Sequence, residues 1–438
     1  MKMDILSTTA IIIVVLLTAL ASGAPVVFCL FGLSILFNLI FLGPQTLYMA
    51  YIALYGNINQ ELFLSIPLFV LMATILESSG VASDLYETMH KWMGGLKGGL
   101  AMGTCLICAL IDAMSGLGAT ATITMAVLAL PEMLKRGYNK ELAIGCIPCG
   151  GALGPLIPPS VIMILLGGLT GLSVGKLFMS GFLPGFLITF FYCVYIFIRC
   201  TLNPKMGPPL PPEERGTWAE KIVSLKRVIP AILLIAVLMA SIYSGACTPT
   251  EAAGLGAAGT FFIVIARRRL TWKVLTGALY TSMKVNGMVL WLLIGGTAFS
   301  AMLNSLGISN FLSDYLINIS GSILVVVAVM VVITLIMGCL MDAGAVLMIL
   351  TPVFYPVVRK LGMDPLWFSG VFVIALVMGY VTPPFGMNLF YMKGLVPADV
   401  TMKDIWMSVF PYTLMLLLGL ILCILFPRII TYLPSLMT

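Results

Sequence analysis

Two short segments, one in each half of the chain, cannot form continuous helix although both lie inside long apolar stretches. They read GPLIPPS at 154–160 and GYVTPPF at 379–385, so the second follows the first by 225 residues. A proline pair removes two amide donors, and its rings clash with carbonyls one turn back. In lipid the freed backbone groups must be satisfied by protein, water or an ion, so such breaks normally line cavities. A matched pair of broken membrane helices therefore points to the binding site of a secondary transporter.

The composition of the 438 residues independently indicates a membrane protein. Hydrophobic residues make up 61% of the chain and charged residues 9%. Apolar runs of about sixteen residues recur, for example at 27–42 and 183–198. The net charge of +6 does not indicate nucleic-acid binding, because the basic residues gather in short loops rather than on one helix face. We expect an all-α polytopic protein embedded in a lipid bilayer.

The similarity between the halves extends beyond the two breaks. PEMLKRG at 131–137 corresponds to PVVRKLG at 356–362 with the same offset of 225 residues. The small-residue segment MSGLGAT at 114–120 likewise corresponds to CLMDAGA at 339–345. The chain is therefore predicted to contain an internal structural repeat.

The predicted repeats are residues 1–200 and 228–438, joined by a polar, proline-rich cytoplasmic connector at 201–227. In the first repeat the apolar stretches 100–113 and 120–134 are each too short to cross a bilayer and meet at a glycine-rich tip. They predict a re-entrant hairpin. The predicted hairpins are about 98–135 and 321–358, and the predicted broken helices are about 141–168 and 366–393.

The distribution of charge predicts the orientation. The base of the first hairpin, the connector and the loop at 267–273 carry most of the 23 Lys and Arg residues, so the positive-inside rule places them in the cytoplasm. Each repeat then has five crossings plus one hairpin, and the odd number of crossings inverts the second copy. This places the N-terminus in the periplasm. Arg359 and Lys360, at the base of the second hairpin, fall on the outer side against the rule.

The hairpin tips combine residues that suit a hard monovalent cation. Glycines permit unusual backbone conformations, hydroxyls supply oxygen ligands, and helix ends expose unpaired carbonyls. Close helix packing through small residues is the alternative explanation. The candidate cation-binding residues are Ser115, Gly116, Gly118, Thr120 and Gly154 in the first half, and Gly338, Asp342, Gly379 and Thr382 in the second.

An ionisable group at membrane depth is by default a functional candidate. Asp342 could balance a cation or cap a half-helix, whereas Asp112 could equally serve in packing or hydrogen bonding. A carboxylate substrate between the breaks would use uncharged donors and half-helix N-termini. The candidate substrate-binding residues are Pro159, Ser160, Pro384 and Asn388, and helix capping or an interhelical hydrogen bond is the structural alternative.

The remaining motifs favour structural roles. Two Cys-x-x-Cys pairs, beginning at Cys105 and Cys146, have the form of a zinc site, but thiolates at membrane depth are expensive and thiols behave there as small apolar groups. Thr248 and Glu251 form a capping box at the start of a helix. His90, the sole histidine, is expected to be solvated in a charged loop. No hydrolase, nucleotide-binding or metalloprotease motif is present, so the sequence does not indicate an enzyme.

Several of these segments occur together, in order, in a known family. They are IPLF at 66–69, SG at 115–116, GPLIPPS at 154–160, CTPTEAA at 247–253, MD at 341–342 and TPP at 382–384. Together they resemble the large, DctM-like membrane subunit of tripartite ATP-independent periplasmic (TRAP) transporters over nearly the whole chain. At the first tip the family often has Ser-Gly-Ser, whereas Leu117 and Gly118 stand here after Gly116.

The resemblance implies sodium-driven uptake of organic acids across the bacterial inner membrane by an elevator-type movement of the hairpin domain. It implies two partners, a small four-helix membrane subunit and a periplasmic substrate-binding protein, and no cofactor beyond the coupling sodium ions. A stand-alone sodium- or proton-coupled dicarboxylate or anion symporter of related fold is an alternative. A channel or assembly subunit without its own transport cycle is another.

Overall fold

The computed structural model describes residues 4–116 and 118–437, and all regular secondary structure in these ranges is helical. Eight of the described helices are long and apolar enough to cross a membrane. The expectation of an all-α multi-pass membrane protein is thereby confirmed. Helices of the first half are α1 (Ile5–Ala21), α2 (Val26–Phe41), α3 (Thr46–Ile58), α4 (Ser65–Ser78), α5 (Val81–Met93), α6 (Gly99–Ser115), α7 (Gly118–Lys135), α8 (Lys140–Gly150), α9 (Val161–Thr170) and α10 (Val174–Leu202).

The second half begins after two short 3-10 turns, Pro204–Met206 and Pro212–Glu214, and another such turn, Glu61–Leu64, precedes α4. Helices of the second half are α11 (Trp218–Tyr243), α12 (Pro249–Ala266), α13 (Trp272–Ser305), α14 (Ile308–Asn318), α15 (Ile323–Leu340), α16 (Ala343–Lys360), α17 (Pro365–Val381), α18 (Met387–Lys393), α19 (Met402–Leu425) and α20 (Arg428–Ser435).

Local sequence explains where several of these helices begin. The predicted capping box is present at α12, where the Thr248 hydroxyl accepts from the Glu251 amide and the Glu251 carboxylate accepts from the Thr248 amide. Thr217 and Thr401 cap α11 and α19 in the same reciprocal way. These boxes satisfy amide donors that the first helical turn leaves unpaired.

Two helix pairs are each joined by a short turn. α6 and α7 are 17 and 18 residues long and turn at Gly116, whereas α15 and α16 are 18 residues each and turn at Met341 and Asp342. The arms of the first hairpin are three residues longer than the apolar stretches suggested, because the small residues near the tip remain helical. Neither arm of the first hairpin is among the described helices that are long and apolar enough to cross a membrane, whereas α15 and α16 both are.

The helices stop at both proline pairs. α8 ends at Gly150 and α9 begins at Val161, whereas α17 ends at Val381 and α18 begins at Met387. The Pro158–Pro159 and Pro383–Pro384 bonds are both cis. α17 and α18 are 17 and 7 residues long and α8 and α9 are 11 and 10, so the second break lies closer to the end of its segment than the first.

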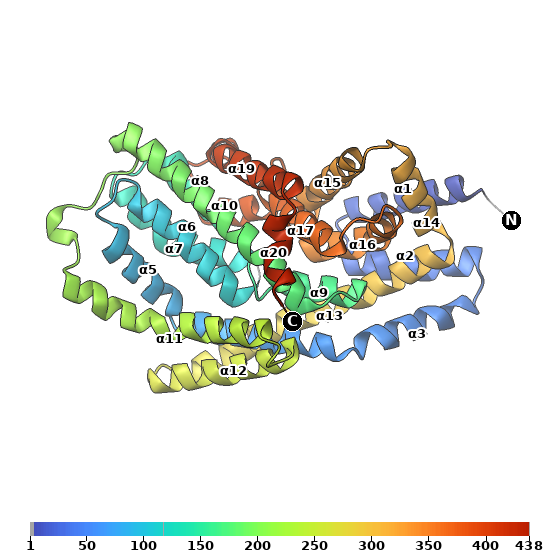
Figure 1. Cartoon of the computed structure of the whole chain (residues 1–438), viewed down its shortest axis with the longest axis horizontal. Coiled ribbons are helices and arrows are strands. Elements are labelled where there is room, and N and C mark those ends of the chain that lie inside the picture. The colour runs from blue at the N-terminus through green and yellow to red at the C-terminus, as the bar shows by residue number, and fades with distance from the viewer. Residues whose placement is uncertain (1–3, 117, 438) are drawn as a thin grey trace.

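The two hairpins lie on opposite sides of the molecular centre (Figure 1), with α17 and α20 between them. The first hairpin packs on α8, and α15 packs on α17. The 34-residue helix α13 contacts α2, α3, α4 and α16. This long helix therefore forms a wall against which the second hairpin rests.

The connector between the halves is less solvated than its composition suggested. The Gly98 amide donates to the Gly207 carbonyl at 2.8 Å, and the Leu210 amide donates to the Gly94 carbonyl at 2.7 Å. Leu210 is buried, and Arg136 pairs with Glu214. The segment is thus fastened to the base of the first hairpin, because its backbone finds partners at the α5–α6 corner.

The placement of His90 in a solvated loop was also wrong. His90 lies in the last turn of α5, half-buried, with its ring 6.3 Å from that of Tyr86. Burial, followed by the nearby Arg136, holds its pKa below the usual value. The ring lies near Glu132 and Arg136 of α7, a neighbourhood that a charge count along the sequence does not reveal.

We expect Gly379→Ala to destabilise the protein by about 1–3 kcal/mol, because α15 and α17 touch there through bare backbone. A Cβ at Gly379 would lie 2.8 Å from the carbonyl carbon and Cα of Gly338, which cannot retract as a flexible side chain can. Thermal unfolding of the purified protein measures the effect. Gly254→Ala is the matched control, since nothing lies within 4 Å of its Cβ position. Equal melting temperatures for the two variants would contradict this contact.

Candidate binding site between the hairpin tips

The first hairpin tip is seated on the first helix break. Gly116 ends α6 in the left-handed conformation, with φ of +61°, and its amide donates to the Asp112 carbonyl at 2.8 Å. A Cβ at this position would lie 2.7 Å from the Pro159 carbonyl oxygen and 3.1 Å from the Val161 amide nitrogen. Both the backbone conformation and the lack of space therefore require glycine.

The second tip is held by a carboxylate. Asp342 is the N-cap of α16, with the Gly344 amide donating to its Oδ2 at 2.9 Å. The Tyr380 hydroxyl donates to Asp342 Oδ1 at 3.0 Å and accepts from the Ala343 amide at 3.1 Å. Tyr380 lies in the last turn of α17, next to the second break. The capping alternative for Asp342 is thus present, and the cap ties the tip to the broken helix of its own half.

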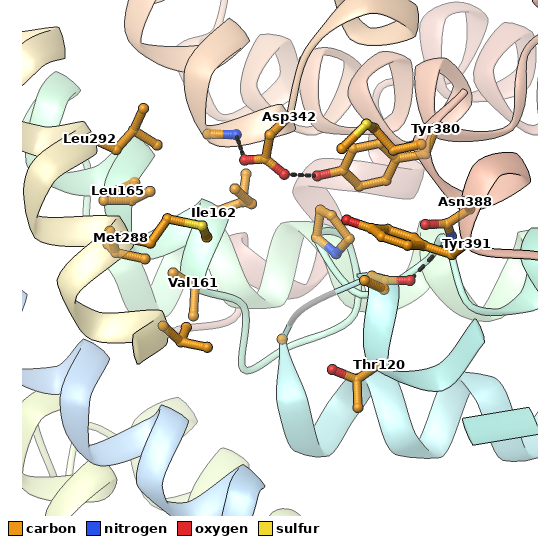
Figure 2. Close-up of a pocket in the computed structure, with 18 residues that line it drawn as sticks. Thr120, Val161, Ile162, Leu165, Met288, Leu292, Asp342, Tyr380, Asn388 and Tyr391 are labelled. Atoms are coloured by element: carbon orange, nitrogen blue, oxygen red, sulfur yellow. Dashed lines mark hydrogen bonds between the residues drawn. The ribbon is translucent and has the colours of Figure 1, made fainter. Parts of the chain in front are cut away.

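A cavity of about 240 Å³ lies where the two tips and the two breaks meet. Figure 2 places Asp342 and Tyr380 on one side of it, Asn388 and Tyr391 on another, and Thr120 at the first tip. The facing wall is apolar. Its lining consists of Val161, Ile162 and Leu165 from α9 and Val285, Met288, Val289 and Leu292 from α13.

The charge of the cavity comes from Asp342. Asp342 is exposed and lines this cavity, whose facing wall is apolar. The described lining residues include no Lys, Arg or His. A ligand that binds here must therefore bring its own positive charge or hydrogen-bond donors to Asp342, because an unpaired carboxylate in an apolar site is unfavourable.

Asn388 fastens the second break to the first hairpin. Its side-chain nitrogen donates to the Gly118 carbonyl at 3.1 Å, to Thr122 Oγ1 at 3.1 Å and to the Pro148 carbonyl at 3.2 Å. Gly118 and Thr122 belong to α7, whereas Pro148 is near the end of α8 where its carbonyl has no helical donor. One buried amide thus joins segments separated by about 240 to 270 residues.

Five predicted residues come together at the cavity: Gly116, Gly118, Thr120, Asp342 and Asn388. The others lie behind it. Gly338 and Gly379 touch each other, the buried Ser160 caps α9 while donating to the Pro155 carbonyl at 2.7 Å, and Thr382 donates to the Met378 carbonyl at 2.6 Å. Ser115, Gly154 and Pro159 are buried beside the first tip, Pro384 is exposed at the second break, and Leu117 lies outside the described residues.

Several lining residues escaped the sequence analysis. Tyr380 directly follows Gly379 of the second break, and this adjacency is the signal that could have identified it. Tyr391 follows Asn388 by almost one helical turn. The α13 wall carries no comparable mark, since Met288 and Leu292 belong to an ordinary apolar helix and only the fold brings them to the tips.

Asp112 lies behind the first tip and is fully buried. The backbone N–H groups of Leu153 and Gly154 in the first break interact with this carboxyl group, but neither of its oxygens has a hydrogen bond of ordinary length and angle. Its closest charged neighbour is Glu77 at the end of α4. This buried carboxyl group lies between the hairpin and the break, and the sequence left a functional role open beside one in packing or hydrogen bonding.

The four cysteines of the two Cys-x-x-Cys pairs are buried free thiols. Cys105 Sγ lies 3.6 Å from the Cys146 carbonyl oxygen and Cys108 Sγ lies 3.9 Å from that of Ile147. No group of three or more metal-ligating side chains occurs among residues 4–116 and 118–437. The thiols thus pack α6 against α8.

A multi-pass helical protein with a binding cavity between paired helix breaks belongs to the class of membrane transporters. The chain matches the family model described as "Tripartite ATP-independent periplasmic transporter, DctM component" over residues 13–429, and it belongs to this family. The resemblance seen in the sequence is thereby confirmed.

Curated relatives match along almost their whole length. The large permease protein of the C4-dicarboxylate TRAP transporter of Pseudomonas aeruginosa is 29% identical, covering 92% of each chain. The 2,3-diketo-L-gulonate TRAP large permease protein of Escherichia coli is 29% identical, covering 95% of this chain and 96% of that protein. The ectoine TRAP large permease protein of Halomonas elongata is 28% identical, covering 98% and 99%. These relatives are named as transporter subunits, so the indication against an enzyme is confirmed.

Two solved structures share the fold. The YdaH transporter of Alcanivorax borkumensis superimposes with a TM-score of 0.64 at 14% identity, covering 91% of this chain and 95% of that one. MtrF of Neisseria gonorrhoeae, from a class of antimetabolite efflux pumps, superimposes with a TM-score of 0.62 at 16% identity, covering 99% and 95%.

We expect Asn388→Asp to destabilise the protein more than Asn388→Ala. The aspartate cannot donate to Gly118, Thr122 or Pro148 and places oxygen against two carbonyl oxygens, whereas alanine leaves them unpaired, a cost of about 1–3 kcal/mol each. Thermal unfolding of the purified protein reports the order. Asn318→Asp on the exposed end of α14 is the matched control and should change little. If Asn388→Asp were as stable as the wild type, the Asn388 amide would not be what holds α18 against α7 and α8.

Proposed function

We propose that this chain is the transport subunit of a sodium-driven importer of a small organic acid across the bacterial inner membrane. One observation carries the proposal: both hairpin tips and both broken helices converge on a single cavity that α13 closes. A site assembled from matched breaks in the two halves is the arrangement that secondary transporters use. Family membership supports the transport role, and the relatives named above carry dicarboxylate, diketogulonate and ectoine.

The two halves act in this proposal as inverted repeats of five crossings, one re-entrant hairpin and one broken helix each. Two apolar cavities of about 410 Å³ each, one beside each hairpin, support this repeat arrangement. One separates α11, the first helix of the second half, from α6, and the other separates α1, the first helix of the first half, from α15. The first helix of each half thus faces the hairpin of the other half.

These apolar cavities also favour an elevator-type movement. The moving body would consist of both hairpins and both broken helices, and the remaining helices would form the scaffold. The lining of both cavities is almost wholly hydrophobic, so displacement of the hairpins breaks few hydrogen bonds there. Within the moving body, by contrast, Asn388 and Asp342 supply polar links that keep its parts together.

Sodium is the coupling ion in this proposal. Asp342 supplies negative charge at the cavity, and Gly116, Gly118 and Thr120 place backbone and hydroxyl oxygens at the first tip. Of the proposed substrate ligands, Asn388 lines the cavity directly. Pro159, Ser160 and Pro384 position the break backbones behind it, as Ser115, Gly154, Gly338, Gly379 and Thr382 do for the cation.

The TRAP family supports two partners. A periplasmic binding protein would deliver the substrate, and a small four-helix membrane subunit would complete the assembly. The proposed orientation keeps the N-terminus periplasmic and the base of the first hairpin cytoplasmic. Uptake into liposomes with and without these partners separates this function from that of a stand-alone symporter.

We expect Gly116 substitutions to raise the sodium concentration needed for half-maximal uptake. Any side chain must adopt a φ of +61°, and its Cβ would press on the Pro159 carbonyl, so Gly116→Val should act more strongly than Gly116→Ala. A sodium jump on proteoliposomes containing both partners provides the measurement. Gly137→Ala is a control with the same left-handed backbone but no neighbour within 4 Å of the Cβ position. Unchanged sodium dependence in both Gly116 variants would remove the first tip from ion coupling.

A bridge between hairpin and scaffold should arrest transport. Ala109 of α6 and Ala236 of α11 line the same apolar cavity, so cysteines placed at both positions can be joined by a reducible bifunctional reagent. The native Cys105 and Cys108 would first be replaced. Uptake should fall on cross-linking and return with reductant, and each single-cysteine variant should be unaffected. An unchanged uptake rate in a fully cross-linked sample would mean that the hairpin does not move against α11.

A further inference from the structure

A second polar cavity lies farther along the groove that separates α13 from α9 and α16. It measures about 270 Å³, and its polar lining is shared by three helices. These residues are Thr170 of α9, Ser300 and Asn304 of α13, and Thr351, Tyr355 and Arg359 of α16. Nothing in the arrangement described for the central cavity uses them.

The two cavities share their walls. α13 lines the central cavity up to Leu292 and the second cavity from Ser300, which is about 12 Å farther along the helix. α9 likewise contributes Leu165 to the first and Leu169 to the second. The second cavity is therefore a continuation of the same seam between the scaffold and the hairpin body.

A methionine seals the seam between them. Met348 of α16 is buried against Gly296 of α13, where a Cβ would lie 2.5 Å from its Cγ and Sδ atoms. Gly296 falls between Leu292 and Ser300, and hence between the two cavities. In this conformation the side chain separates the Arg359 cavity from the space next to Asp342.

The second cavity is positively charged, in contrast to the central one. Arg359 forms no ion pair among the described residues, and no acidic residue lines the cavity. The adjacent Lys360 is neutralised, because its Nζ lies 2.7 Å from Asp314 Oδ1 and 3.0 Å from Ser313 Oγ. Of the two basic residues that depart from the positive-inside rule, Lys360 is thus paired with an acidic residue, whereas Arg359 remains free to bind an anion.

The cavity also offers an unused buried donor. Thr351 is 4% exposed, and its hydroxyl has no hydrogen-bond partner, although a helical threonine commonly donates to the carbonyl four residues back. The half-buried Ser300 and the exposed Asn304 form no side-chain hydrogen bond with the described residues, so their donors are free as well, but the cost of burial applies to Thr351 alone. A buried polar atom without a partner is expensive, so a ligand that accepts hydrogen bonds would relieve this cost.

We propose that this cavity binds the carboxylate of a small organic anion on the side of the protein opposite the 267–273 loop. The guanidinium of Arg359 supplies charge and paired donors, which suit a planar oxyanion. The hydroxyls of Thr351 and Ser300 and the amide of Asn304 complete the donor set. The site would bind the substrate first, and the substrate would reach the central cavity once the Met348 side chain moves away from Gly296. This role rests on the proposed function.

The test is direct binding to the full-length chain in a neutral detergent, without partners, anionic lipid or sodium. Radiolabelled succinate is the probe, and equilibrium dialysis in choline buffer gives its dissociation constant. Arg359→Gln should weaken binding at least about tenfold, the effect of a lost charge-assisted hydrogen bond. Thr351→Val should weaken it less. Lys360→Gln removes the same charge one residue away and should leave the dissociation constant nearly unchanged. The thermal unfolding of each variant checks that it is folded.

Equal succinate affinity in the wild type and in folded Arg359→Gln would overturn the proposal, and so would absence of binding to the wild type. Equal losses in Arg359→Gln and Lys360→Gln would also overturn it, since the effect would then be general electrostatics. Sodium-dependent uptake in proteoliposomes is measured separately. Uptake that did not depend on sodium would refute the proposed function without changing the dialysis result. Absence of succinate binding would refute the Arg359 site without changing the sodium dependence of uptake.

Discussion

The fold depends on the requirement that every backbone polar group inside a lipid bilayer find a partner. A continuous helix meets this requirement by itself, but the helices are interrupted at two proline pairs, at 151–160 and at 382–386. Polar groups from elsewhere in the chain form hydrogen bonds or close contacts with the backbone at or near these breaks. Asn388 reaches the Pro148 carbonyl, Tyr380 receives the Ala343 amide, and Gly116 brings the first tip against Pro159. The need to satisfy interrupted backbone thus draws both hairpins and both broken helices into one body.

That body has polar links inside and apolar contacts outside. Asn388 and Asp342 connect its parts, whereas the two cavities of about 410 Å³ that separate it from α1 and α11 are lined by aliphatic and aromatic side chains. Dispersion contacts are short-ranged and non-directional, so in the proposed elevator-type movement one apolar surface would replace another. Hydrogen bonds are directional, and they keep the tips and breaks in register.

Along the seam with α13 the distribution of charge changes sign. The central cavity holds a carboxylate and no basic residue, whereas the cavity at the far end holds Arg359 and no acidic residue. Met348 lies between them in the notch at Gly296. An anion attracted to Arg359 would be repelled by Asp342 unless a cation accompanied it, so the order of charges along the seam supports the proposed coupling of anion passage to cation binding.

The sequence alone determined the membrane character, the two breaks and the chemistry of the tips. These follow from local rules: a proline pair stops a helix wherever it occurs, a glycine at a tight tip permits positive φ, and an aspartate before a helix caps it. The tertiary structure decided which distant groups meet. Met348 and the α13 wall bear no local mark, because their roles arise from contacts between segments far apart in the chain. The place of His90 was misjudged for the same reason, since burial against a neighbouring helix is not encoded in the pattern of a single segment.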